Sequence, residues 1–213
     1  MAGCGPAASP TAGPTWLVFH PSGNGFQSQT LDSAPDLTPI RTLRADLDAD
    51  GVPETIHWEG DRAWVERDGT TVWESEPAWH VVDVAVGDFF NDYRQELLLA
   101  MWKDDPAGTP RSHPFIMGHR HGRYDLLWGG SAVADPIRDL DIGDVDGDGQ
   151  NELVVLEGAY EDPSGAPARF VTVWRWNGWG FTLLWRSAPG QFDGLQLPDV
   201  DEDGAIEIVV RAR

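Results

Sequence analysis

The chain has 213 residues, with 35 acidic against 15 basic side chains and a formal net charge of −20 at pH 7. This charge argues against nucleic acid as a partner, because phosphate groups would be repelled. The sequence has no apolar run of 18 residues, so it predicts no membrane-spanning helix, and its single cysteine excludes an intrachain disulfide.

Residues 1–14 read as a flexible spacer, because Cys4 is followed by a stretch rich in Gly, Ala, Ser and Pro with nothing to pack. The Ala-Gly-Cys4 sequence resembles the end of a bacterial lipobox, in which the cysteine is lipidated and tethers the domain to a membrane. No charged or apolar leader precedes Cys4 in this sequence. A lipid anchor at Cys4 and an incidental surface cysteine therefore both stay open.

From residue 15 onward the chain alternates short β-type runs with turn signals, and helical periodicity is hard to find. The same order of parts returns four times, in units of approximately 15–60, 61–104, 112–158 and 167–213. Each unit holds about four short strands. A period of this size with four strands per unit is typical of propeller blades, so the sequence predicts an all-β β-propeller of four repeats.

An acidic signature closes each unit. Three copies, at 46–54, 144–152 and 199–207, read D-x-D-x-D-G-x-x-E in full. The copy at 88–96 has Phe90 at position three and Tyr93 in place of the turn glycine. An apolar β-type run follows every copy at once, at residues 55–58, 97–99, 153–156 and 208–210, so we expect each signature to form a loop between two strands.

The residue types in these loops predict calcium binding. Calcium accepts six to eight oxygen ligands in a flexible geometry, and a glycine at position six allows the tight turn that brings the aspartates together. The expected ligands are the carboxylates at positions one, three, five and nine and the backbone carbonyl at position seven. They are Asp46, Asp48, Asp50, Val52 and Glu54; Asp144, Asp146, Asp148, Gln150 and Glu152; and Asp199, Asp201, Asp203, Ala205 and Glu207. We expect about three ions, with the 88–96 loop empty or weak.

The signature at this blade-sized period resembles the FG-GAP and VCBS repeats of integrin-type propellers and of many secreted bacterial proteins. The resemblance covers roughly residues 15–213, and it implies that the carboxylates above are calcium ligands. This chain departs from the family in two ways. Its closing residue is always Glu, where the family often has Asp, and it has four units, where family propellers often have seven or eight.

Three architectures fit four units. A closed four-bladed monomer is the simplest and is favoured. A larger ring made by two chains, which makes this a homo-oligomer, and an open stack of blades fit the same repeat.

The sequence contains no nucleophile elbow, phosphate-binding loop or zinc-protease motif. Asp139, Asp141 and Asp193 are the acids near the loops that the predicted calcium sites do not use. We therefore expect a non-enzymatic, extracytoplasmic calcium-binding module that presents a loop face to a protein or glycan, with Ca²⁺ stabilising the loops. A polysaccharide lyase or hydrolase and a structural subunit of a calcium-dependent surface assembly are the alternatives.

Eleven tryptophans are many for this length. Trp73, Trp128 and Trp185 sit at equivalent places in their units and are expected in the cores between blades. Trp174, Trp176 and Trp179 cluster around Asn177-Gly178, which predicts a hairpin with a two-residue turn.

Overall fold

The computed structural model describes residues 15–33, 35, 42–90, 92–130, 133–134, 136–163 and 165–213. The spacer with Cys4 lies outside these described residues. Within them the chain forms strands and no helix, so no helix that could cross a membrane is found there. The strands are β1(Thr15–Ser22), β2(Gly25–Thr30), β3(Thr42–Ala45), β4(Glu54–Glu59), β5(Arg62–Arg67), β6(Thr70–Glu74), β7(His80–Gly87), β8(Glu96–Asp104), β9(Pro110–Arg120), β10(Arg123–Gly129), β11(Ile137–Gly143), β12(Glu152–Glu157), β13(Phe170–Trp176), β14(Phe181–Arg186), β15(Phe192–Gln196) and β16(Ile208–Ala212).

These strands form four antiparallel sheets of four strands each, which confirms the predicted all-β fold of four repeated units. Three sheets are meanders of consecutive strands: β3–β6 is the first sheet, β7–β10 the second and β11–β14 the third. The fourth has the order β15-β16-β1-β2 and is called the composite sheet, because it joins both ends of the described chain. Its central pair sets Val18 opposite Val209. The sheet boundaries therefore lie two strands away from the repeat boundaries read from the sequence.

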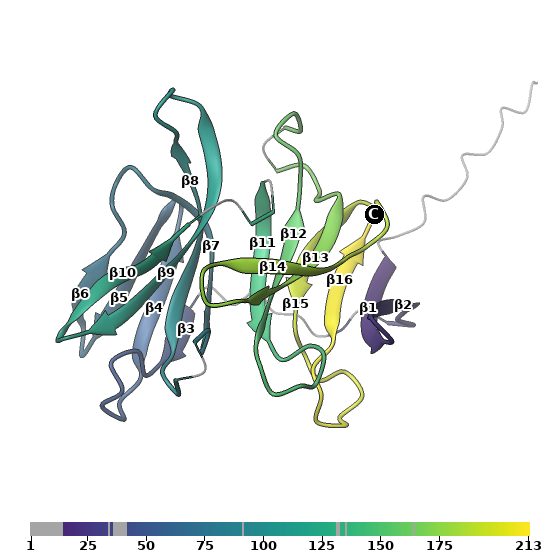
Figure 1. Ribbon diagram of the computed structural model, residues 1–213, viewed down its shortest axis with the longest axis horizontal. Coiled ribbons are helices and arrows are strands. Elements are labelled where there is room, and N and C mark those ends of the chain that lie inside the picture. Colours follow the sequence, from purple (N-terminus) through teal and green to yellow (C-terminus); the bar gives the residue numbers. More distant parts are fainter. Residues whose placement is uncertain are drawn as a thin grey trace, which may run out of the picture.

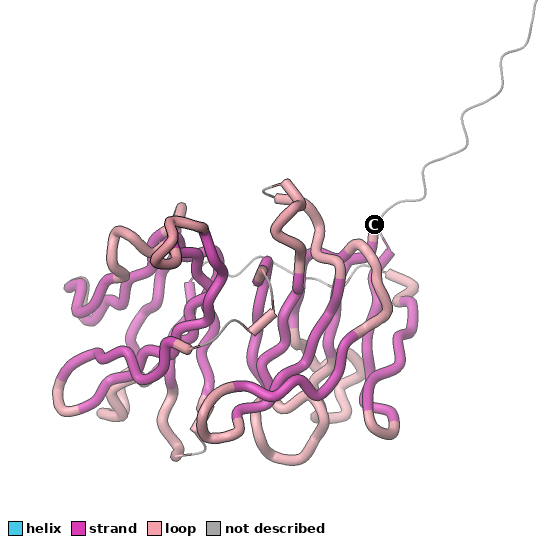
Figure 2. The backbone as a smooth tube through the Cα atoms, turned by 45° about the horizontal axis from the view of Figure 1, so that its top comes forward, coloured by secondary structure: helices cyan, strands magenta, loops and turns pink. Residues whose placement is uncertain are grey.

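The four sheets stand side by side in a row, with the first sheet at one end and the composite sheet at the other (Figures 1 and 2). Three hydrophobic cores fill the spaces between neighbours: first and second sheets, second and third, and third and composite. Among the described residues no such core joins the first sheet to the composite sheet. The four stacked sheets are compatible with the predicted propeller-like fold, and the described residues form a row of blades without the core that would close it into the favoured ring.

The alternation of side chains along each second strand explains why these sheets stack. On β8, Leu97, Leu99 and Met101 belong to the core shared with the first sheet, whereas Leu98 and Ala100 belong to the core shared with the third. Successive side chains of a strand point to opposite faces, so a strand covered on both faces reads as a continuous apolar run. The same holds for β12, which is buried along its whole length.

Aspartates on the first strands of the sheets bind neighbouring sheets to each other. Asp83 on β7 accepts a hydrogen bond from the backbone N–H of Leu140 on β11, at 2.9 Å. Asp139 on β11 repeats the contact with the N–H of Leu195 on β15, at 3.0 Å. Each bond satisfies a backbone donor between two sheets, where water is scarce.

Glycine precedes the acidic loop in the second and third sheets because the neighbouring sheet approaches closely there. A Cβ on Gly87 would lie 2.7 Å from Cγ2 of Ile142, and one on Gly143 would overlap Cδ1 of Ile206. Any larger residue would push the first strands of adjacent sheets apart.

Candidate cation-binding loops

Each acidic signature forms a loop between two strands, as predicted, and in every sheet these are the first and second strands. Loop one is 46–54, loop two 88–96, loop three 144–152 and loop four 199–207. The loops lie along one edge of the row of sheets, the lower edge in Figure 1. The closing glutamate of loops one to three is already the first residue of the second strand.

All four loops share one hydrogen-bond framework. The aspartate at position one accepts the backbone N–H groups of positions five and six, and the aspartate at position five accepts the N–H of position seven. Position six has a positive φ in every loop: 90° at Gly51, 88° at Gly149, 93° at Gly204 and 64° at Tyr93. The framework fixes the backbone of the turn, and it occupies both oxygens of the aspartate at position one.

The closing glutamates are buried, with exposed fractions of 1% at Glu54, 0% at Glu96 and Glu152, and 3% at Glu207. Each accepts the backbone N–H of loop position two through one oxygen. Burial raises the pKa of Glu96 and of Glu152, and their arginine partners oppose that rise. A buried carboxylate requires a positive partner, because an unpaired charge away from water is strongly unfavourable.

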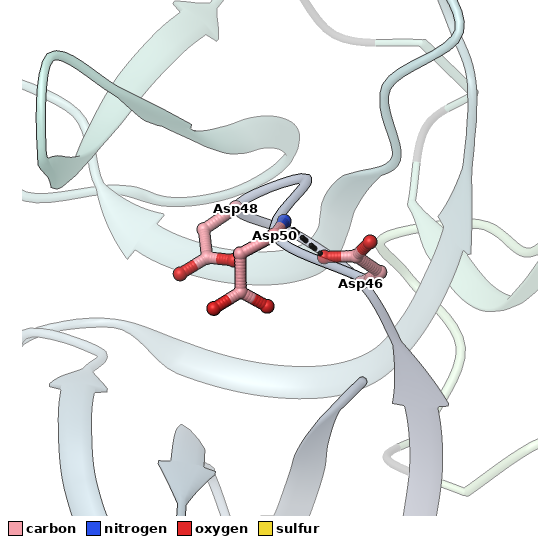
Figure 3. A group of neighbouring side chains, drawn as sticks. All are labelled: Asp46, Asp48 and Asp50. Atoms are coloured by element: carbon pink, nitrogen blue, oxygen red, sulfur yellow. Dashed lines mark hydrogen bonds between the residues drawn. The ribbon is translucent and has the colours of Figure 1, made fainter. Parts of the chain in front are cut away.

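The structure brings three groups of predicted ligands together. In each group one oxygen from every member lies within 4.8 Å of the others: Asp46, Asp48 and Asp50; Asp144, Asp146 and Glu152; Asp199, Asp201 and Asp203. Figure 3 shows the first group, with the carboxylates of Asp48 and Asp50 side by side and that of Asp46 bonded to the backbone nitrogen of Asp50. Glu54, Asp148 and Glu207 are not members of these groups. The carbonyls of Val52, Gln150 and Ala205 stay predictions.

The donor chemistry of these groups fits a hard cation. Every grouped ligand atom is a carboxylate oxygen, with no nitrogen or sulfur. Oε1 of Glu54 is also buried without a hydrogen-bond partner, beside loop one. Calcium is the divalent ion that accepts such an irregular all-oxygen set most readily.

Loop two keeps the framework without the full set of acids. Phe90, at position three, packs edge-on against Trp176 with ring centroids 5.2 Å apart. Tyr93, at position six, holds a left-handed backbone conformation that side chains with a Cβ rarely adopt. Loop two therefore has Phe90 at position three in place of an acid, and this side chain contacts the third sheet instead of a cation.

Arginines on the third strand of three sheets reach into the loops, and the sequence analysis missed them. Arg67 on β5 contacts Asp48 at 2.5 Å and also Asp50; Arg120 on β9 contacts Glu96 at 2.6 Å. Arg175 on β13 lies opposite Glu152 in the strand register and contacts Asp146, Asp148 and Glu152 at 2.6–2.8 Å. Burial disfavours the charged form of Arg175, but these partners raise its pKa overall. The sequence did offer a signal for these contacts: an arginine recurs at or near the end of β5, β9 and β13, the third strand of each of these sheets.

The spare acids considered for catalysis have structural partners. Asp139 accepts the N–H of Leu195, Asp141 accepts the N–H of Ile142 at 2.8 Å, and Asp193 pairs with Arg211 and with Arg213 at 2.5 Å. Burial, followed by the charge of Asp139, raises the pKa of Asp83 well above its usual value. Burial raises the pKa of Asp139 as well, and its interaction with Asp83 opposes that rise.

Two aromatic side chains on the loop edge are almost fully exposed: Tyr93 at 98% and Trp179 at 90%. Trp179 lies in the turn between β13 and β14. The register sets Trp176 opposite Phe181, which confirms the predicted hairpin. The N–H of Asn177 donates to the carbonyl of Gly180 at 2.9 Å, so the two residues at the tip are Gly178 and Trp179, one position beyond the expected Asn177 and Gly178. The side chain of Asn177 accepts the N–H groups of Trp179 and Gly180 and so stabilises the turn.

These two exposed aromatics are held on loops that pack together. Phe89 of loop two meets Phe181 of the hairpin at 6.2 Å between ring centroids. The indole nitrogen of Trp128 donates to the backbone oxygen of Trp179 at 2.9 Å. Trp128, Trp176 and Phe181 also contact one another edge-on, so the base beneath the exposed residues is rigid.

No protein-family model matches this chain, and no curated protein matches it. Among solved structures, the crystal structure of BBS1N in complex with ARL6DN, soaked with lead, is similar at a TM-score of 0.30 and 9% sequence identity. The alignment covers 80% of this chain and 73% of that chain. The fold assignment therefore rests on the four sheets of this protein itself.

Proposed function

We propose that this protein is a non-enzymatic, extracytoplasmic binding module of the FG-GAP/VCBS kind, in which Ca²⁺ stabilises the acidic loops and an aromatic loop surface contacts a protein or glycan. The observation that carries the binding role is the pair Tyr93 and Trp179, exposed by 98% and 90% on adjoining loops. Exposed aromatic rings on a rigid base supply large contact areas at interfaces and stack on sugars.

The backbone at Tyr93 supports this role. A non-glycine residue in the left-handed region costs of order 1 kcal/mol, and such strain persists mostly where a side chain has a task. The other three loops have glycine at the same position. The ring of Tyr93 is open to solvent, so no stabilising contact explains why a strained tyrosine occupies this position.

Calcium binding is supported by the grouped carboxylate oxygens, which offer a hard cation several oxygen ligands within 4.8 Å of one another. Sites built from exposed acids suit the millimolar calcium outside cells better than the micromolar or lower levels of the cytosol. This difference in calcium concentration supports a location outside the cytoplasm.

A role without catalysis is favoured because Asp139, Asp141 and Asp193 each accept bonds from backbone or arginine groups. A glycosidase would need two carboxyl groups free to face a sugar. A polysaccharide-cleaving activity would be seen as product release on incubation with acidic and neutral glycans.

The experiment that tests the proposal has two parts. Calorimetric titration of CaCl2 into chelator-treated protein is expected to show at least one ion per chain and a higher Tm with calcium. Glycan-array and peptide-display binding are expected to yield a ligand whose affinity falls at least tenfold in Trp179→Ala, while Tm is unchanged. An unchanged Tm and no heat with calcium, or equal ligand binding by Trp179→Ala, would contradict it.

A further inference from the structure

In loops one and three a guanidinium group lies where a bound cation would be expected, among the carboxylates of positions three, five and nine. Arg175 engages Oδ2 of Asp146, Oδ2 of Asp148 and Oε1 of Glu152. Arg67 engages Oδ2 of Asp48 and of Asp50 and lies 3.8 Å from Oε1 of Glu54. Two loops with the same sequence signature therefore pair their acids with one arginine in the same way.

The remaining oxygens of these acids are also used. In loop three, Oδ1 of Asp146 accepts the N–H of Asp148, and Oδ1 of Asp148 accepts the N–H of Gln150. In loop one, the Oδ1 atoms of Asp48 and Asp50 accept the N–H groups of Asp50 and Val52. A divalent ion would have to displace the arginine, since one site cannot hold both positive groups at ligand distance.

Loop four carries the full signature without an arginine. The third-strand residue nearest its closing glutamate is His20, whose Nδ1 stays 4.0 Å from Oε1 of Glu207. Within the described part of the chain, Asp201, Oδ2 of Asp203 and Oε1 of Glu207 have no hydrogen bond. Glu207 is only 3% exposed; its Oε2 accepts the N–H of Val200, and among the described residues its Oε1 has no closer cationic partner than His20.

We propose that Arg67 and Arg175 are the resident cations of loops one and three, and that loop four, Asp199 to Glu207, is the divalent-cation site of this protein. The inference rests on the proposed calcium function and replaces the expected three ions by one. Unlike a soluble ion, a tethered arginine never dissociates. Loops one and three are thus stabilised at any calcium concentration, and only the composite sheet responds to the ion.

The test compares calcium binding of matched arginine variants. Wild-type protein is expected to bind one Ca²⁺, and Asp201→Ala, which removes a loop-four carboxylate that makes no hydrogen bond within the described chain, is expected to bind none. Arg175→Met removes the resident cation and is expected to bind a second ion. In chelator its Tm should fall by about 10 °C, because Glu152 loses its partner, and calcium should restore most of that loss.

Loop two supplies the matched control. Arg120 contacts Glu96 as Arg175 contacts Glu152, but Phe90 stands where the position-three acid is needed. Arg120→Met should therefore lower Tm to a similar degree without gaining an ion and without rescue by calcium. Arg62→Met, which breaks an exposed pair with Glu74, should change neither measurement. Near-ultraviolet circular dichroism will show whether Arg175→Met is folded. Arg175→Gln provides a second variant without the positive charge in case the methionine variant misfolds.

The outcomes separate this inference from the proposed function. Three ions of similar affinity in wild type would leave the calcium function standing and overturn the role of the arginines. One ion that survives Asp201→Ala would overturn the assignment to loop four, and an Arg175→Met variant that gains no ion would overturn the resident-cation role. No calcium in wild type or in any variant would refute the proposed calcium function itself.

Discussion

Asp141 carries a carboxylate whose ionisation the fold opposes. Burial raises its pKa from 3.8 to about 6, and the N–H of Ile142 and the charge of Asp139 are weaker influences. The folded state thus holds a proton that the unfolded chain releases at lower pH. Stability that is present below pH 3.8 is lost as the pH rises through about 6.

Asp141→Asn is therefore expected to stabilise the protein at neutral pH. The amide oxygen still accepts the N–H of Ile142, and no charge is buried. The gain over wild type should be near zero at pH 4 and reach up to about 3 kcal/mol at pH 7.5, measured by urea unfolding. Asp68→Asn, at an exposed turn, controls for the change in net charge. A difference that is the same at both pH values would contradict the assignment.

Tyr93 is the second residue where local structure and stability conflict. Its φ of 64° is a value that glycine adopts without cost. Tyr93→Gly is expected to leave the free energy of unfolding unchanged or to raise it by about 1 kcal/mol, since relief of strain offsets the extra entropy of the unfolded chain. Ligand binding should weaken in the same variant. A loss of more than 1 kcal/mol would show that the ring stabilises loop two.

At the scale of elements, the first strands of neighbouring sheets are joined by one repeated contact. The carboxylates of Asp83 and Asp139 each accept a hydrogen bond from a backbone N–H of the next sheet. Because burial raises the pKa of Asp83, an asparagine can imitate its protonated form. The carboxyl pair thus acts as a structural link between three sheets.

Asp83→Ala is expected to destabilise the protein by about 1–3 kcal/mol, because the N–H of Leu140 is left unsatisfied between two sheets. Asp83→Asn should cost less than 1 kcal/mol, as its amide can accept from Leu140 and donate to Asp139. Chemical denaturation of both variants at pH 7 provides the comparison. Equal losses in the two would mean that charge, and not the hydrogen bond, is what matters at this position.

At the scale of the whole molecule, the row of sheets places β3 and β15 far apart, although both are first strands (Figure 1). Stacked sheets lie about 10 Å apart, so three steps separate the outer sheets by roughly 30 Å. A closed ring would instead bring these two strands together beside the axis.

Dipolar distances between spin labels distinguish these shapes. In a Cys4→Ser background, labels at Arg44 and Val82 report neighbouring sheets, and labels at Arg44 and Gln196 report the two outer sheets. We expect the second distance to be at least twice the first. Similar distances for both pairs would show that the ring closes in solution.

Local features could be predicted from the sequence and distant pairings could not. The strands after each acidic loop and the turns at Gly51, Gly149 and Gly204 follow from apolar runs and turn chemistry. The pairing of β1 with β16 could not be predicted, because the residues around Val18 and Val209 carry no sequence signal of their distant partner. The arginine contacts were missed for the same reason, since Arg175 meets Asp146 only after two strands have paired.

The composite sheet makes the order of synthesis matter. Among the described strands, the hairpin β1–β2 is synthesised before all the others, whereas its partner β16 is synthesised after them. Until Ile208 to Ala212 emerges, Val18 and Phe19 lack the strand that covers one edge of their hairpin, and a two-stranded hairpin alone is barely stable in water. A nascent chain released before Ile208 therefore keeps that edge open to aggregation or to protease.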